Sequence, residues 1–104
     1  MQNEMEHYIL EGKEIKKCNS LMEWAEWFKN SENRIIKQDT INGVFISTIF
    51  LGIDHGYNGE LILFETMIEK DGNQELTRYC TYDEAVQGHE EEKQKVINNK
   101  EDKI

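Results

Sequence analysis

The chain has 104 residues, which suits one domain, because typical domains have roughly 100–150 residues. Hydrophobic residues make up 38% of it and aromatic residues 10%, which is enough large apolar surface for one core and argues against disorder. Its 21 acidic and 12 basic residues give a net charge of −9, so we expect no direct binding to nucleic acid or to an anionic membrane surface, both of which need clustered Lys and Arg.

Membrane insertion and secretion are not expected either. No segment approaches the roughly 20 apolar residues of a membrane-spanning helix, and the first six residues lack the basic and apolar blocks of a secretion signal. Neither Cys18 nor Cys80 has a second Cys or a His at the spacing of a metal-binding finger, and nothing supports a disulfide between them. We therefore expect a cytoplasmic protein with free thiols and no metal or cofactor.

A short hairpin is predicted to open the chain. Residues 7–10 and 13–18 are the predicted strands, with a turn at Glu11-Gly12, where glycine takes a positive φ. Ser20 and Glu23 then have the spacing of a capping box, which predicts a helix that starts after Ser20. This helix presents an apolar stripe composed of Leu21, Trp24, Ala25, Trp27 and Phe28.

Four strands in a meander are predicted for the middle of the chain. Asn42-Gly43 and Asp71-Gly72 are typical two-residue hairpin turns, and each is flanked by runs of β-branched and aromatic residues. A nine-residue loop, Gly52–Glu60, separates the two hairpins. The strands are expected at residues 34–41, 44–51, 61–68 and 76–80.

A second helix is predicted to end the domain. Thr81 and Glu84 have the spacing of another capping box, and the residues that follow place His89 on the apolar side of the helix. Residues 98–104 are expected to be a frayed tail, which leaves one domain at residues 1–97. The predicted fold is therefore α+β, in the order β-β-α-β-β-β-β-α, with an antiparallel meander sheet packed with two helices.

The hairpin turns also predict which residues lie opposite each other. The expected pairs are Ile36–Ile49, Gln38–Ser47, Glu65–Arg78, Met67–Leu76 and Leu63–Cys80. The longer loop does not fix the register between the hairpins. If Leu51 lies opposite Leu61, Ser47 lies opposite Glu65, and a polar row crosses the sheet through Gln38, Ser47, Glu65 and Arg78.

Both faces of this sheet are expected to be largely apolar. One face would include Ile36, Phe45, Ile49, Met67 and Leu76, and the other would include Ile35, Val44, Ile46, Phe50 and Phe64. Because a solvated sheet face normally alternates apolar with polar residues, both faces should be covered. The two helices would cover one face, and the N-terminal hairpin or a second copy of the chain would cover the other. This pattern predicts a homodimer.

The loop between the hairpins is the first candidate site, because loops longer than a hairpin needs often hold functional residues. Asp54 and His55, together with His89, are candidates for a metal or acid–base site. No HExxH, HxH or His-Cys pattern supports metal binding. The alternative is a turn in which Asp54 accepts hydrogen bonds from nearby backbone amides.

Glu65 and Arg78 are the second candidate site. They would hold an anion or a sugar, or else form a cross-strand ion pair that fixes the register. His89 has a plainer alternative as well, since a hydrogen-bonded core histidine is the ordinary outcome on the apolar side of a helix. Cys80 precedes a helix start, which can lower a thiol pKa, but its expected inward direction predicts an inert thiol.

Several separated motifs resemble a family of small uncharacterised proteins encoded in bacteriophages and prophages. They are Ser47–His55 (STIFLGIDH), Leu63–Met67 (LFETM), Arg78-Tyr79, Glu84-Ala85 and Gly88-His89. The resemblance covers roughly residues 8–90. It implies a phage or mobile-element origin and a host cytoplasm rather than a particular reaction. It also draws attention to residues that lie within the motifs, namely Asp54, His55, Glu65, Arg78 and His89.

No phosphate-binding loop and no nucleophile–histidine arrangement is evident, so the sequence favours a non-enzymatic protein. We expect a phage accessory module that forms homo-oligomers and binds a host or phage protein. One alternative is a small-molecule or metal-binding protein, or an enzyme, that uses the Asp54-His55 loop and the Glu65/Arg78 pair. Another is an acidic inhibitor that imitates DNA on a host defence enzyme, which the net charge permits although the acidic residues are dispersed.

Overall fold

The computed structural model describes residues 6–56 and 59–101. Within these ranges the chain forms a two-stranded and a four-stranded antiparallel sheet with two α-helices, which confirms the predicted α+β fold. A short 3₁₀ helix, η1, is added before the third strand. The elements are β1 (His7–Glu11), β2 (Glu14–Cys18), α1 (Leu21–Phe28), η1 (Ser31–Asn33), β3 (Ile35–Ile41), β4 (Val44–Phe50), β5 (Phe64–Lys70), β6 (Asn73–Tyr79) and α2 (Tyr82–Glu101).

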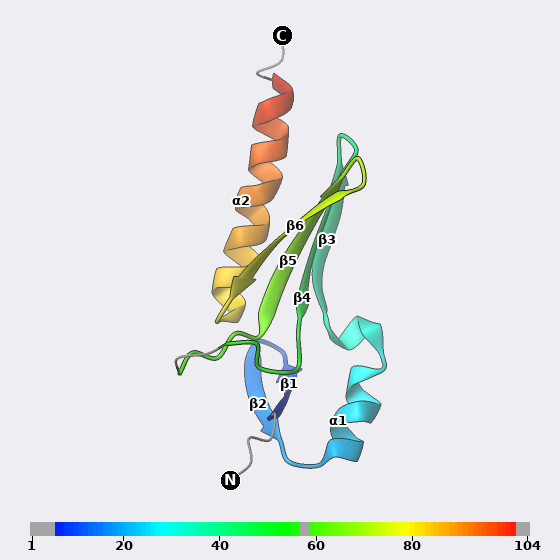
Figure 1. Ribbon diagram of the computed structural model, residues 1–104, viewed down its shortest axis with the longest axis vertical. Coiled ribbons are helices and arrows are strands. Elements are labelled where there is room, and N and C mark those ends of the chain that lie inside the picture. Colours follow the sequence, from blue (N-terminus) through cyan, green and yellow to red (C-terminus); the bar gives the residue numbers. More distant parts are fainter. Residues whose placement is uncertain (1–5, 57–58, 102–104) are drawn as a thin grey trace.

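The four-stranded sheet has the order β3-β4-β5-β6, as a meander requires. It lies beside α2 in the upper part of Figure 1, whereas the β1–β2 hairpin and α1 lie below it. Helix α1 packs on this hairpin, and the Trp24 indole Nε1–H donates to the Tyr8 carbonyl at 3.0 Å. Helix α2 thus lies along one face of the sheet, whereas α1 packs on the hairpin and reaches the sheet where Trp27 meets Phe50 edge to face.

The two-residue turns form as predicted. Asn42 and Asp71 have φ of 53°, and the glycines that follow have φ of 83° and 82°. Two successive positive φ values define the hairpin turn whose twist matches that of the flanking strands. The pairs Gln38–Ser47, Glu65–Arg78 and Met67–Leu76 are confirmed. The ladder between β5 and β6 starts at Phe64–Tyr79, so the expected Leu63–Cys80 pair lies beyond it. In the first hairpin, the turn lies at Gly12-Lys13 rather than at Glu11-Gly12.

A β-bulge in β3 changes the expected pairing at the start of that strand. Ile35, not Ile36, lies opposite Ile49, and Ile36 is the extra residue. The bulge exchanges the directions of the two isoleucines, because neighbouring strand residues point to opposite faces. Ile36 packs against the buried core, and Ile35 is 38% exposed on the other face. A turn fixes the register only as far as the first bulge.

The register between the two hairpins also differs from the prediction. Ser47 lies opposite Met67, and Glu65 lies opposite Ile49, a shift of two residues. Because side chains alternate with a period of two, this shift keeps every side chain on its predicted face. It nevertheless divides the expected polar row into two separate pairs, Gln38–Ser47 and Glu65–Arg78.

Only one face of the sheet is covered, and α2 covers it. The residues buried on this covered face are Val44, Ile46, Thr48, Phe50, Phe64 and Thr66. We call the other side the open face. It consists of Ile35, Gln38, Thr40, Phe45, Ser47, Ile49, Glu65, Met67, Glu69, Gln74, Leu76 and Arg78. The expectation that both faces are covered was wrong for the single chain, since neither α1 nor the β1–β2 hairpin lies over this side.

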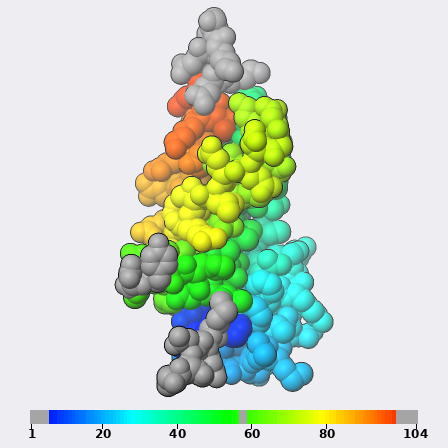
Figure 2. All heavy atoms as spheres, in the orientation of Figure 1, coloured from blue at the N-terminus to red at the C-terminus, as the bar shows by residue number. Residues whose placement is uncertain are grey.

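The edge strand β6 is the most exposed strand of the sheet. Six of its seven residues are exposed, and Leu76 in its middle keeps 54% of its surface in contact with solvent. Figure 2 shows β6, in yellow and yellow-green, on the viewed surface.

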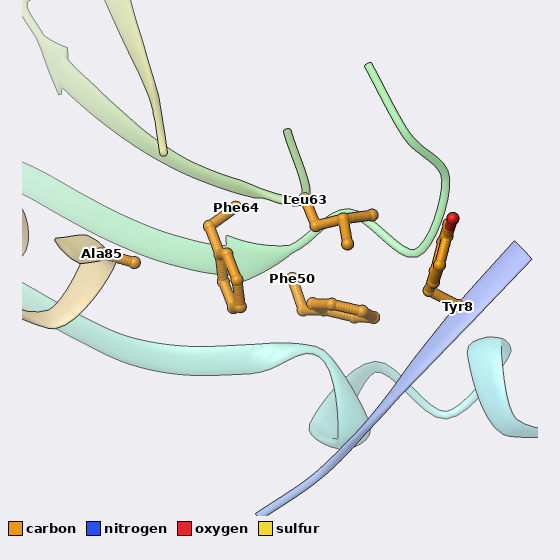
Figure 3. Packing of buried hydrophobic residues seen from close by; sticks show 5 residues of the cluster. All are labelled: Tyr8, Phe50, Leu63, Phe64 and Ala85. Atoms are coloured by element: carbon orange, nitrogen blue, oxygen red, sulfur yellow. The ribbon is translucent and has the colours of Figure 1, made fainter. Parts of the chain in front are cut away.

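A cluster of buried residues joins the two parts of the molecule. It consists of Tyr8 from the hairpin, Phe50 and Phe64 from the sheet, Leu63 and Ala85, shown in Figure 3. The rings of Phe50 and Phe64 meet edge to face, with centroids 5.3 Å apart. The Tyr8 backbone N–H also donates to the Gly52 carbonyl at 2.8 Å, which fixes the hairpin against the loop that follows β4.

Helix α2 begins with the predicted capping box. The Thr81 hydroxyl accepts from the Glu84 N–H at 3.1 Å, and the Glu84 carboxylate accepts from the Thr81 N–H at 3.2 Å. The helix continues to Glu101, past residue 98 where the sequence predicts the start of a frayed tail, and no Gly or Pro interrupts it there. Residues 102–104 of that predicted tail lie outside the described residues. In the part of the chain that is described, no helix is long and apolar enough to cross a membrane.

Candidate functional site

The five candidate residues lie in three places. Asp54 and His55 belong to the loop between β4 and β5. Glu65 and Arg78 lie on the open face, and His89 lies in α2 against the covered face. The sheet therefore separates the Glu65–Arg78 pair from His89, and the five residues form no single site.

Asp54 organises its own loop. Its carboxylate oxygen Oδ1 accepts from the Gly56 N–H at 2.8 Å and from the Ile62 N–H at 2.9 Å. The His55 N–H donates to the Ile62 carbonyl at 3.0 Å, so the two ends of the loop are held together. This is the turn geometry that we gave as the alternative to a metal or acid–base site. The His55 side chain is exposed.

Glu65 and Arg78 form a cross-strand ion pair, with Arg78 Nε donating to Glu65 Oε2 at 3.0 Å. The Arg78 side chain is 43% exposed and the Glu65 side chain 14% exposed. A pair that is open to water on one side contributes little to stability. It gives the open face a charged end beside its apolar centre.

His89 is fully buried and has a hydrogen-bond partner at each ring nitrogen. Nε2 lies 2.8 Å from Asp39 Oδ2, and Nδ1 lies 2.7 Å from Thr48 Oγ1. Thr48 Oγ1 lies 2.5 Å from Thr66 Oγ1, and both threonines are fully buried. These four residues, which we call the His89 network, connect three strands to α2.

The ionised carboxylate of Asp39 determines the direction of these hydrogen bonds. It accepts only, so His89 Nε2–H donates to it, and in the neutral ring Nδ1 must accept from the Thr48 hydroxyl. Thr48 Oγ1 in turn accepts from the Thr66 hydroxyl. The hydrogen bond from His89 lowers the pKa of Asp39, and the nearby charges of Lys93 and Lys37 lower it further, against the opposing effect of burial. Each polar group of the network therefore has a partner.

The order Asp39–His89–Thr48 resembles a carboxylate–histidine–hydroxyl triad, but Thr48 is completely inaccessible to solvent. No substrate can reach a hydroxyl that lies between a sheet and a helix. The network therefore supports a structural role, in agreement with the expectation of a hydrogen-bonded core histidine. The sequence pointed to His89 but not to its partners Asp39, Thr48 and Thr66.

The two cysteines are free thiols and are partly buried. Burial raises the pKa of Cys80, and the nearby carboxylates of Glu60, Glu84 and Asp54 raise it further. A raised pKa reduces the thiolate fraction at neutral pH, so this thiol has none of the activation that a helix start can provide.

The candidate residues share neither a metal cluster nor the hollow that lies beside α2. Across residues 6–56 and 59–101, no three His, Cys, Asp or Glu side chains gather closely enough to hold a metal ion. A hollow of about 700 Å³ lies between the tips of the two hairpins and the second half of α2. Its lining mixes Val44, Ile68 and Val96 with charged side chains such as Lys70 and Lys95, and it includes none of the five candidates.

The open face is the candidate functional surface that the geometry favours. Phe45, Ile49 and Met67 are only partly buried there, and Leu76 is more than half exposed, next to the charged pair Glu65–Arg78. An apolar centre with a polar border is the composition of a protein interface. Comparisons with protein-family models, with curated proteins and with solved structures gave no match.

Proposed function

We propose that this chain is a non-enzymatic module that forms homo-oligomers and binds another protein through its four-stranded sheet. The open face supports this proposal, because it places apolar residues of β4, β5 and β6 on a side that no other described element covers. Exposed apolar patches of this kind usually mark protein contacts.

The same proposal includes the origin of the protein. The resemblance of the motifs between Ser47 and His89 to phage and prophage proteins suggests an accessory protein that acts in the host cytoplasm. A partner would then be a host or phage protein. The net charge of −9 supports a protein partner over a nucleic acid, because a phosphate backbone repels an acidic surface.

Two measurements test the proposal. Sedimentation equilibrium of the full chain should show a reversible oligomer at micromolar concentration, whereas a monomer at all concentrations would contradict self-association. Partner binding is tested with Met67→Glu, which places a charge in the centre of the open face. The matched control is Leu21→Glu, because Leu21 is 61% exposed in α1 and lies outside that face.

Proteins captured from host cells by the wild-type chain should be retained by the Leu21→Glu variant and lost by the Met67→Glu variant. Each captured protein is then purified and titrated against the three chains. Equal binding to all three would contradict a role for the open face in partner recognition.

A further inference from the structure

The two edges of the four-stranded sheet are protected differently. At one edge, β3 contains the bulge at Ile36, and its charged residues Lys37 and Asp39 point toward α2. Bulges and inward-pointing charges are devices that prevent an edge strand from pairing with another chain. At the other edge, β6 keeps seven consecutive pairs with β5, from Phe64–Tyr79 to Lys70–Asn73, with no bulge.

The free edge of β6 has weaker protection, since it has no bulge and Glu75 is the one charged residue that it directs to the α2 side. The strand contains neither proline nor lysine, and apart from Tyr79 all of its residues are exposed. In the described part of the chain, β5 is the only strand that pairs with it. Its outer row of backbone N–H and C=O groups is a ready template for one more antiparallel strand.

We infer that two copies of this chain pair through β6, antiparallel and centred on Leu76, so that a single eight-stranded sheet forms. This inference rests on the self-association proposed above and identifies the surface that produces it. Leu76 is the middle residue of β6, so a twofold axis there pairs all seven residues and places the two leucines opposite each other.

The charges of β6 are compatible with this register. Pairing centred on Leu76 places Gln74 opposite Arg78 of the second copy and Glu75 opposite Thr77 of the second copy, with no like charges opposed. Centring on Glu75 instead would oppose two glutamates. A twofold axis that passes through a residue, rather than between two residues, also keeps both α2 helices on the same side of the joined sheet. This follows because directly opposed residues of an antiparallel pair point to the same face.

Pairing at β6 also enlarges the open face. Four strands about 4.8 Å apart and seven residues long give this face a projected area on the order of 450 Å². A stable interface buries about 800 Å² on each partner, which exceeds the projected area of one open face. Joining two sheets at β6 makes one continuous surface of roughly twice that area, which is enough for a protein partner.

Charge substitutions at Thr77 test this arrangement. Thr77 lies opposite Thr66, so it points to the α2 side and away from the open face. In the β6 dimer, position 77 of each copy lies opposite Glu75 of the other copy. Thr77→Glu therefore creates two like-charge pairs, whereas Thr77→Lys creates two opposite-charge pairs. We expect Thr77→Glu to raise the dimer Kd roughly tenfold relative to Thr77→Lys in sedimentation equilibrium at low salt. Equal dimer Kd values for the two variants would overturn the β6 interface.

Substitutions at Thr40 provide the matched control. Thr40 is exposed on β3, on the open face and at the opposite edge of the sheet. Thr40→Glu and Thr40→Lys should leave the dimer Kd unchanged. If the Thr40 variants weaken the dimer and the Thr77 variants do not, the two chains pack through their open faces. That outcome would support self-association but overturn the β6 interface. A wild-type chain that stays monomeric contradicts both.

A mixing experiment tests the twofold axis at Leu76. Leu76→Glu and Leu76→Lys should each weaken the homodimer, because like charges then lie opposite each other across the axis. An equimolar mixture of the two variants should form a heterodimer with at least roughly tenfold lower Kd than either homodimer. Failure of the mixture to associate more tightly than its components would overturn the pairing centred on Leu76.

Discussion

The imidazole Nδ1 of His89 lies 2.7 Å from the hydroxyl oxygen of Thr48, at a place where neither side chain contacts solvent. This contact joins the middle of α2 to the second strand of the sheet. Because Thr66 and Asp39 complete the network, a fully buried histidine retains two hydrogen-bond partners. The network thereby fixes the position of α2 along the sheet, which apolar packing alone specifies less strongly.

Replacing Thr48 by valine should destabilise the chain although the shape of the side chain is kept. The substitution removes the donor to His89 Nδ1 and the acceptor of the Thr66 hydroxyl, and unsatisfied buried groups cost about 1–3 kcal/mol. Urea denaturation would measure this loss. Thr40→Val, at an exposed position of β3, is the control and should stay within about 0.5 kcal/mol of the wild type. A Thr48→Val chain as stable as this control would show that the network contributes nothing.

Asp39 should make the stability of the chain sensitive to acid. Its pKa in the folded chain is lowered from the ordinary value of 3.8, mainly by the hydrogen bond from His89. A lowered pKa means that the carboxylate stabilises the fold above pH 3.8 and that this contribution is lost as the pH falls through the lower folded-state value.

Asp39→Asn keeps a carbonyl oxygen for His89 Nε2–H but does not titrate. Below about pH 5, the free energy of unfolding should therefore fall less steeply for Asp39→Asn than for the wild type. Urea denaturation curves at a series of pH values between 2 and 7 would measure both slopes. Parallel pH profiles would contradict this account of Asp39.

Local sequence signals predicted most of the fold. The Asn-Gly and Asp-Gly turns require two positive φ values, and the capping box at Thr81 satisfies specific backbone donors, so each signal determines its element without the rest of the chain. The register across the loop from Leu51 to Leu63 depends instead on contacts such as those of Asp54, which come from the folded loop. The bulge at Ile36 likewise depends on packing against the core.

The His89 network was harder to predict than the fold. Asp39 and His89 are 50 residues apart in sequence and meet only because α2 crosses β3. No local pattern marks Asp39, since an aspartate in an edge strand usually points to water. His89 itself was recognisable, because a histidine on the apolar side of a helix needs polar partners. Where those partners come from is determined by tertiary structure.

Tyr8 should make stability sensitive to alkali, with the opposite sign to Asp39. Burial raises its pKa from 10.0 to about 12, and its hydrogen bond to Glu6 adds to this effect. A raised pKa means that the protonated phenol stabilises the fold below pH 10 and that the contribution is lost as the pH rises toward 12. Raising this pKa from 10.0 to about 12 corresponds to about 2–3 kcal/mol of unfolding free energy.

Tyr8→Phe removes this titration and keeps the ring in the core. Between pH 9 and about pH 12, the variant should lose less unfolding free energy than the wild type. Some loss should remain, because burial also raises the pKa of Tyr79 and of Cys80. Urea midpoints measured across this pH range test the difference, and equal losses in both chains would contradict a buried Tyr8 phenol.

Gly88 allows α2 to approach β6 closely, so Gly88→Ala should be destabilising. An added Cβ at this position would overlap the hydroxyl end of Tyr79. In an open helix position the same substitution gains roughly 0.5–1 kcal/mol, whereas overpacking costs about 1–3 kcal/mol. Gln87→Ala, at the exposed neighbouring position, is the control and should change stability by less than about 0.5 kcal/mol.

A double-mutant cycle identifies the cause of the Gly88→Ala effect. If the overlap with Tyr79 is responsible, adding Gly88→Ala to a Tyr79→Ala chain should cost nothing or even stabilise it, because the space beside the helix is then free. The coupling free energy between the two substitutions should be about 1–3 kcal/mol. Strictly additive effects, measured by thermal and urea denaturation, would mean that Tyr79 does not limit the residue at position 88.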